Sequence, residues 1–288
     1  MKIVSRIFLI TGIVIFVIGA VIAIVGAATN SWNFSNIKYE YLTETLENAT
    51  DLTVKSGDGD GNFITKFYDG EDVVIEYAVN EKYREGKITK TEENNYLFES
   101  FFHNHRKFGF VWFHKIPETI IKIPTGYALN IDFKLTAGNV ELGDGEYKNL
   151  TFNLAAGNIQ ADSVTAENLT VNLDAGNFQA ENLTVTNKST LDLDAGNFEI
   201  ENLTCPAIKA KLSMGNFYTD KLVCDNVEAI VNMGNLQFNI VGDENDYTVK
   251  AQCKMGSSNI KNRQGNDPDK LIDLTVDMGN ITVNFINL

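Results

Sequence analysis

A Gly-Asn pair that returns at a nearly constant interval is the feature that most restricts the fold of this chain. The glycines, with Gly256 included, follow one another at spacings of 19, 19, 20, 19, 19, 22 and 23 residues. A fixed period near twenty residues is typical of solenoids, in which each repeat forms one layer. The pairs are Gly138-Asn139, Gly157-Asn158, Gly176-Asn177, Gly196-Asn197, Gly215-Asn216, Gly234-Asn235 and Gly279-Asn280.

Apolar and polar residues alternate strictly before each glycine. In one repeat, Leu169, Val171 and Leu173 occupy the positions seven, five and three residues before Gly176, with polar residues between them. This alternation indicates a strand with one buried face. A second short inward strand follows the pair, and it starts at Phe178 in the same repeat. We therefore predict an all-β fold, in which residues 131–288 form a single parallel β-solenoid with about 19–20 residues per coil.

The Gly-Asn pairs themselves are predicted to be structural corners of the coils. Glycine adopts the left-handed backbone without a steric penalty, and asparagine is the next most tolerant residue there. Asparagine side chains stacked on neighbouring coils are also able to hydrogen-bond to one another. All seven pairs are therefore assigned to one corner of the solenoid.

The N-terminus resembles a membrane anchor. Residues 7–28 contain no charged residue, and a helix of this length reaches about 33 Å, enough to cross the hydrocarbon core. Lys2 and Arg6 precede this stretch. We predict a cytoplasmic N-terminus (residues 1–6), a transmembrane signal anchor (7–28) and an extracytoplasmic C-terminal domain at the cell membrane. The alternative is a signal peptide cleaved near Val25-Gly26-Ala27.

Two regions lie between the predicted helix and the predicted solenoid. Residues 29–48 are interpreted as a linker. Residues 49–130 are predicted to form a cap of antiparallel β-hairpins, with turns at 57–61 and 68–70, because solenoids need a cap to shield their first coil.

Residues 96–115, the aromatic segment, interrupt the strand patterns of the predicted cap. The segment holds all three His of the chain, together with Phe, Trp and basic residues, in a protein whose net charge is −14. Aromatic and basic residues together are typical of a membrane interface or a partner surface. The candidate binding surface consists of Phe101, Phe102, His103, His105, Arg106, Lys107, Phe110 and Trp112. The alternative is a hairpin whose aromatic side chains pack over the first coil.

We predict no cofactor, no metal site and no nucleic-acid partner. The acidic net charge argues against phosphate-backbone binding. His103 and His105 lack a third ligand nearby, and the calcium-loop-like spacing of Asp58, Asp60 and Asn62 has no glycine at its sixth position. Cys205 and Cys224 fall at the same place in adjacent repeats, where we expect stacked, reduced thiols.

Catalysis is also not predicted, although parallel solenoids include enzymes that act on polysaccharides. Asp174 and Asp194 occupy one outward column on neighbouring coils, at a spacing that suits a retaining glycosidase pair. No His, Arg or cleft-forming loop converges on them. We therefore interpret them as solvated surface acids, with a carbohydrate-active enzyme as the alternative function.

The chain resembles a bacterial family of β-strand-repeat proteins labelled "putative adhesin". The resemblance rests on the repeated pattern Ala137-Gly138-Asn139-Val140-Glu141-Leu142, on residues 120–124 and 129–133, and on the aromatic residues around Phe101. It covers about residues 40–288. It implies a membrane-anchored protein of the Gram-positive envelope, with some members linked to envelope stress.

These patterns together predict a non-catalytic, membrane-anchored module for extracytoplasmic binding, adhesion or envelope-stress sensing. Envelope glycan, lipid or a membrane protein is the expected partner, and self-association through the helix or the last coil is a further possibility. A scaffold that polymerises end to end is a second alternative to an enzyme, because the apolar C-terminal residues 281–288 would make an unusual free end for a solenoid.

Overall fold

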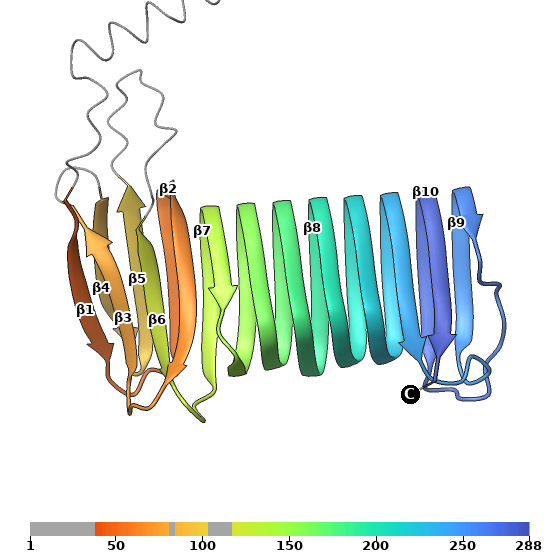
Figure 1. The fold of residues 1–288 in the computed structure, drawn as a ribbon, viewed down its shortest axis with the longest axis horizontal. Helices are drawn as coiled ribbons and strands as arrows, with labels where there is room; N and C mark the ends of the chain where they lie inside the picture. Colours follow the sequence, from red (N-terminus) through yellow and green to blue (C-terminus); the bar gives the residue numbers. More distant parts are fainter. Residues whose placement is uncertain (1–37, 81–83, 103–116, 288) are drawn as a thin grey trace, which may run out of the picture. The chain divides into compact units, whose positions relative to one another are not determined.

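A computed structural model describes residues 38–80, 84–102 and 117–287 of this chain. These residues form one hydrogen-bonded sheet of ten strands, as Figure 1 shows. The strands are β1 (Glu40–Leu46), β2 (Asp51–Tyr68), β3 (Val73–Val79), β4 (Arg84–Glu92), β5 (Asn95–Phe102), β6 (Glu118–Pro124), β7 (Leu129–Leu142), β8 (Gly145–Val241), β9 (Thr248–Ser258) and β10 (Leu271–Ile286).

The predicted membrane helix, residues 7–28, lies outside the described ranges. Within those ranges, no helix is long and apolar enough to cross a membrane. The strand pairing of the described residues extends from Glu40 in β1 to Ile286 in β10.

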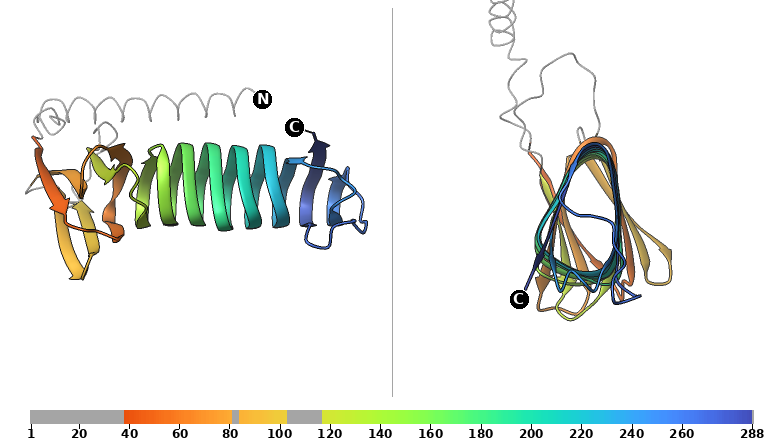
Figure 2. Two further views of the ribbon diagram at one scale, coloured as in Figure 1. Left: turned by 90° about the horizontal axis from the view of Figure 1, so that it is seen from below. Right: turned by 90° about the vertical axis from the view of Figure 1, so that its right-hand side faces the viewer.

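The parallel solenoid predicted from the repeats is confirmed. β8 is a single strand of 97 residues that winds through successive coils, and the coils superimpose when the rod is viewed along its axis in Figure 2. β7 pairs with β8 in parallel register, with Gly138 opposite Gly157 and Phe133 opposite Phe152. Inside the rod, Phe178, Phe198, Phe217 and Phe238 form a continuous chain of buried edge-to-face ring contacts.

The seven predicted Gly-Asn corners lie in one column of the rod. Their glycines have φ between 142° and 149°, and the space beside each one is filled by the backbone of the neighbouring coil. A Cβ atom built on Gly157 would lie 1.6 Å from the carbonyl oxygen of Gly138. The Asn side chains form a ladder in which Asn177 Nδ2, for example, donates to Asn158 Oδ1 at 3.1 Å. Glycine is therefore required by close stacking as well as by backbone angle.

The solenoid begins earlier than predicted. We expected residues 49–130 to be a hairpin cap, but β2 is itself a coil, parallel to β7, with Leu52 opposite Ile131 and Phe63 opposite Val140. Gly61 and Asn62 stand opposite Gly138 and Asn139, and Asn139 Nδ2 donates to Asn62 Oδ1 at 3.1 Å. The predicted turn at 57–61 is instead a corner that contains extra residues.

One further coil lies beyond β2, and only then does the antiparallel cap begin. The two halves of β2 pair in parallel with β5 and with β6, so β5 and β6 together form the first coil. β4 is antiparallel to β5, β3 is antiparallel to β6, and β1 is antiparallel to β3. The hairpin cap therefore consists of β1, β3 and β4 rather than of the whole region 49–130.

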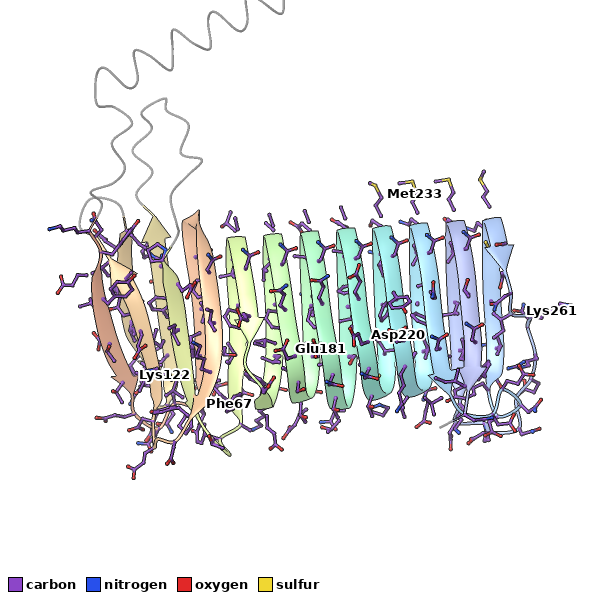
Figure 3. All side chains as sticks on the ribbon, viewed as in Figure 1. Phe67, Lys122, Glu181, Asp220, Met233 and Lys261 are labelled. Carbon is purple, nitrogen blue, oxygen red and sulfur yellow. The ribbon has the colours of Figure 1, made fainter. Side chains whose placement is uncertain are left out.

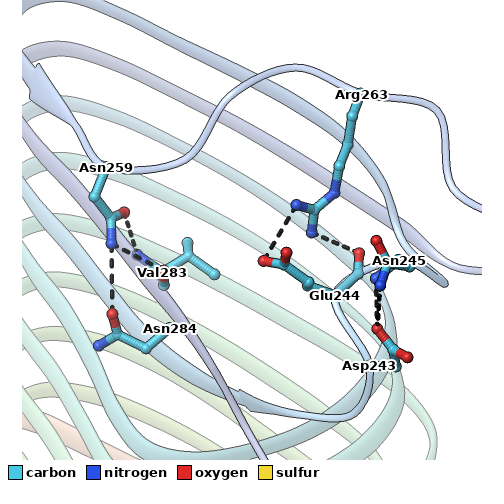
Figure 4. A network of polar contacts seen from close by, with 7 residues as sticks. All are labelled: Asp243, Glu244, Asn245, Asn259, Arg263, Val283 and Asn284. Carbon is cyan, nitrogen blue, oxygen red and sulfur yellow. Dashed lines mark hydrogen bonds and ion pairs between the residues drawn. The ribbon is translucent and has the colours of Figure 1, made fainter.

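At the other end of the rod, the apolar C-terminal strand is not the free edge. β10 lies between the last coil of β8 and β9, and it pairs in parallel with both. Beyond the end of β9, the Asn259 side chain continues the pairing, since its Nδ2 donates to Val283 O and its Oδ1 accepts from Val283 N. Arg263 forms an ion pair with Glu244, as Figure 4 shows, and its backbone bonds to Val249 on the outer edge of β9. This arrangement weakens the case for end-to-end polymerisation.

The buried Tyr147 predicts a loss of stability at alkaline pH. Its hydroxyl donates to Gly143 O at 3.0 Å and lies 2.6 Å from Thr65 Oγ1, and burial raises the pKa of Tyr147 well above its ordinary value. The unfolded chain ionises this phenol near pH 10 while the folded chain does not. Its contribution to stability is therefore complete below about pH 10 and is lost as the pH rises above it, by at most about 1.4 kcal/mol per pH unit.

Tyr147→Phe is expected to make this alkaline decline shallower, and to destabilise the protein by about 1 kcal/mol at neutral pH. Urea unfolding at pH 9 and pH 11 measures both effects. A smaller decline of stability with rising pH should persist in the variant, because burial also raises the pKa of Tyr247 to about 12. An unchanged slope between pH 9 and pH 11 in the variant would contradict the assignment to Tyr147.

Candidate functional site

Residues 103–116, here named the corner insert, connect β5 to β6 in the sequence and lie outside the described ranges. β5 ends beside the first half of β2, with Ser100 opposite Ser56, and β6 starts beside the second half, with Glu118 opposite Asn62. The residues of β2 between these two points are the ones that form its corner. The end of β5 and the start of β6, which flank the corner insert, therefore lie on the edge of the rod that carries the Gly-Asn corners.

The buried residue Arg84 joins the two ends of the corner insert. Its side chain is 2% exposed, and its backbone is opposite Phe102 in the pairing of β4 with β5. On the other side, Arg84 Nη1 donates to Pro117 O at 2.8 Å and Nη2 donates to Thr119 Oγ1 at 3.2 Å. The planar guanidinium holds two acceptors at once, which a lysine ammonium does less well. We name this group, Arg84 with Pro117 and Thr119, the arginine clamp.

The described chain starts on the same edge as the corner insert. Glu40, the first residue of β1, is opposite Val79 in β3. Next to Val79, Asn80 and Arg84 exchange two backbone hydrogen bonds of 2.8 Å. The start of β1, the arginine clamp, the end of β5 and the start of β6 thus lie at the same end of the rod, where Figure 1 shows β1, β3, β4, β5 and β6.

Residues 48–284 match the family model of the Toastrack DUF4097 family. The chain belongs to this Toastrack family. The fold also matches solved structures described as "putative adhesin" from Parabacteroides distasonis ATCC 8503 and Parabacteroides merdae ATCC 43184. The first is 14% identical with a TM-score of 0.54, and the alignment covers 87% of this chain and 98% of that one. The second is 14% identical with a TM-score of 0.53, covering 87% and 97%. No curated protein matches the chain.

The described part of the Toastrack domain contains only the first two residues of the candidate binding surface. Phe101 lies in β5, is 38% exposed, and places its ring over Gly57, where an added Cβ would be 2.9 Å from Phe101 Cδ1. Phe102 is the last residue of β5. A shallow cavity of about 300 Å³ beside Phe101 is also lined by Val79, Arg84 and Lys87. The residues outside the described ranges are His103, His105, Arg106, Lys107, Phe110 and Trp112.

A second concave surface runs along the outside of the Toastrack rod. It is a groove of about 530 Å³ that crosses several coils, with Asp162, Glu181, Glu201 and Asp220 in one column. Figure 3 labels Glu181 and Asp220 on this face. The Tyr218 hydroxyl donates to Asp220, which raises the pKa of Tyr218. This acidic column was not predicted from the sequence.

Asp174 and Asp194 are both exposed, and Asp194 Oδ1 accepts a hydrogen bond from Ser213 Oγ at 3.1 Å. Cys205 and Cys224 are free, buried thiols whose sulfurs lie 3.4 Å apart, and the hydrogen bond between them, with burial, raises the pKa of Cys224. Within the described ranges, no group of three or more His, Cys, Asp or Glu residues is arranged to hold a metal ion.

Proposed function

We propose that this Toastrack protein is a non-catalytic binding module of the cell envelope. In this proposal, residues 7–28 anchor the chain in the membrane, the rod lies outside the cytoplasm, and the aromatic segment contacts an anionic surface of the envelope. The phosphate groups of lipid headgroups or of wall polymers would supply that surface.

The observation that carries the proposal is the common position of the arginine clamp and the start of β1. A fully extended chain between residue 28 and Glu40 spans at most about 40 Å. If residues 7–28 cross the bilayer, the edge that carries the corner insert therefore stays within that distance of the membrane surface. The buried hydrogen bonds of Arg84 hold the strands on either side of the insert, so they fix the two points between which the insert runs.

The distribution of charge also favours an orientation in which the aromatic segment faces the anionic surface. Between Phe101 and Lys115 the chain has no acidic residue, and it carries Arg106, Lys107 and Lys115, whereas the whole protein has a net charge of −14. An anionic surface attracts the basic insert and repels the acidic rod within about one Debye length, about 8 Å at physiological salt. Aromatic side chains beside the basic residues are suited to the interface between headgroups and acyl chains.

A binding role agrees with the description "putative adhesin" given to the solved structures that share this fold. The candidate glycosidase pair, Asp174 and Asp194, is exposed on the rod. Exposed Asp residues on a polar face are most often solvated surface acids.

The test is binding of residues 33–288 to anionic liposomes, neutral liposomes, Gram-positive wall fragments and intact cells. The triple variant Phe101→Ser, Phe102→Ser, Trp112→Ser removes three aromatic rings of the segment. The matched control is Tyr41→Ser, which removes the 69% exposed ring of β1 outside the segment. Both variants are checked for folding by circular dichroism.

We expect the wild type and the Tyr41 variant to bind at least one anionic surface, with weaker binding at high salt, and the triple variant to lose at least about tenfold in affinity. A comparison of binding to anionic liposomes with binding to wall fragments identifies which surface supplies the phosphates. Absence of binding to all four targets, or equal binding by the triple variant, would reject the aromatic segment as the binding surface.

A further inference from the structure

Every methionine of the chain except Met1 lies in one column of the rod, directly before a corner glycine. These four residues are Met214, Met233, Met255 and Met278. Four other corners have Ala at this position, namely Ala137, Ala156, Ala175 and Ala195, and the corner of β2 has Asp60. The chain therefore uses methionine at a single structural position, and only in one half of the solenoid.

The four methionines stand on four consecutive coils. Met278 is opposite Met233 on one side and opposite Met255 on the other, and the backbones of Gly234 and Gly215 are in contact, which places Met214 next to Met233. Because neighbouring strands lie about 4.8 Å apart, the side chains form a ladder with that repeat. Figure 3 shows the four sulfur-bearing side chains in a row along the corner edge, with Met233 labelled. We name this row the methionine ladder.

The ladder is exposed, which packing alone does not explain. The four side chains are 53%, 40%, 43% and 67% exposed in the order Met214, Met233, Met278, Met255. The buried core of the described ranges is built from Phe, Leu, Ile, Val, Ala and Tyr with two Cys, and it uses no Met. A simple apolar stripe could equally use Leu or Ile. Exclusive use of Met where the side chain is exposed points to a role for the thioether sulfur.

We propose that the methionine ladder is a binding site for a soft monovalent cation, Cu(I), which Ag(I) can replace. Thioether sulfurs are soft ligands that select Cu(I) over the hard divalent cations. Flexible Met side chains with three rotatable bonds can bring sulfurs from adjacent coils together around one ion. The site needs no oxidant or reductant, since the ion binds in the oxidation state in which it is supplied.

Thioether ligands carry no proton, which separates this site from one made of thiols. Cysteine and histidine sites lose metal as the pH falls, because protons compete with the metal. Binding by the ladder should therefore be nearly constant from pH 7.5 to pH 5.5. Cys253 is the nearest competing sulfur in sequence to the ladder, and it is partly buried, with its Sγ 3.3 Å from Gly279 O.

The test uses the full chain in a mild detergent, with the methionine methyl groups labelled with carbon-13. Ag(I) is added first, and Cu(I) is then added to a second sample without oxygen. We expect the four ladder methyl resonances to shift with a saturable, stoichiometric titration while that of Met1 stays in place. The quadruple variant Met214→Leu, Met233→Leu, Met255→Leu, Met278→Leu keeps the apolar volume and removes the sulfurs. Its affinity should fall at least about tenfold, which a competing chromophoric Cu(I) chelator measures.

Cys253→Ala is the matched control, and it should bind as the wild type does. Three results would overturn the proposal. They are unmoved ladder resonances on addition of either ion, equal affinity of the quadruple Leu variant, and an affinity that falls tenfold or more between pH 7.5 and pH 5.5.

Discussion

Replacing Gly196 by Ala is expected to destabilise the rod by at least about 4 kcal/mol, or to prevent folding. Gly196 has φ of 142°, and an added Cβ would lie 1.6 Å from the carbonyl oxygen of Gly176 on the next coil. The atom in the way is backbone, so a rotamer change does not relieve the contact. The coils on either side must separate, which breaks the hydrogen bonds that stack them. Urea unfolding followed by circular dichroism measures the loss.

Gly126→Ala is the matched control for this experiment. Gly126 also has a positive φ, of 80°, but an added Cβ there has no atom within 4 Å. This variant measures the cost of a positive φ for Ala without any steric contact, and it should be destabilised by only about 1 to 2 kcal/mol. If Gly196→Ala lowered the free energy of unfolding no more than Gly126→Ala does, close stacking would not be the reason for glycine at the corner.

Replacing Arg84 by Met is expected to destabilise the protein by about 2 to 4 kcal/mol and to loosen the ends of the corner insert. The guanidinium is buried and donates to Pro117 O and Thr119 Oγ1, so its removal leaves two buried acceptors without these bonds. Methionine fills part of the volume but offers no donor. Unfolding in urea gives the free energy, and amide hydrogen exchange in β5 and β6 gives the local effect.

Lys87→Met is the control, because Lys87 is an exposed cation on the same strand, β4. It should change stability by less than about 0.5 kcal/mol and leave exchange in β6 unaltered. Equal effects of the two substitutions would mean that Arg84 is not the residue that joins the ends of the insert.

The sequence was sufficient to predict the solenoid wherever the repeat is regular. It failed at β2 because no Gly-Asn pair stands between Gly61-Asn62 and Gly138-Asn139, and because three residues, 57–59, stand opposite the single residue Thr136. The Gly and Asp residues of this irregular corner also match the composition of a hairpin turn. The extra residues displace the alternating strand before the corner by two positions, so it no longer aligns with the other repeats.

The order of β9 and β10 in the sheet also could not be predicted from the repeat alone. The coil at Gly256 has Ser257 in place of Asn, and the spacings on either side of it are the longest in the series. The residues between β9 and β10 are long enough to bring β10 back beside β8. The apolar β10 then has a partner on both sides, whereas β9, with the charged Lys250 and Lys254, takes the edge. Charged residues on an edge strand discourage pairing with another chain.

The aromatic and basic composition of the candidate site could be recognised in the sequence. The buried hydrogen bonds of Arg84 that hold the strands beside it could not. The aromatic and basic residues of the segment stand out in an acidic chain. The strands that flank it, β5 and β6, are placed by their register against β2, and these pairings join distant residues. The burial of Arg84 was not predicted, because a single basic residue between Tyr83 and Glu85 is typical of an exposed position near a turn. Its burial arises only when β4 and β6 come together.

The most direct test of the central claim is a hydrogen-exchange footprint of residues 33–288 with and without the anionic surface that binds best. The proposal predicts slower exchange in peptides that cover residues 96–117, and unchanged exchange in the coils of β8 that carry the acidic groove. Protection of the acidic column around Glu181 and Asp220, with none in residues 96–117, would contradict it and would make the outer groove of the rod the binding surface.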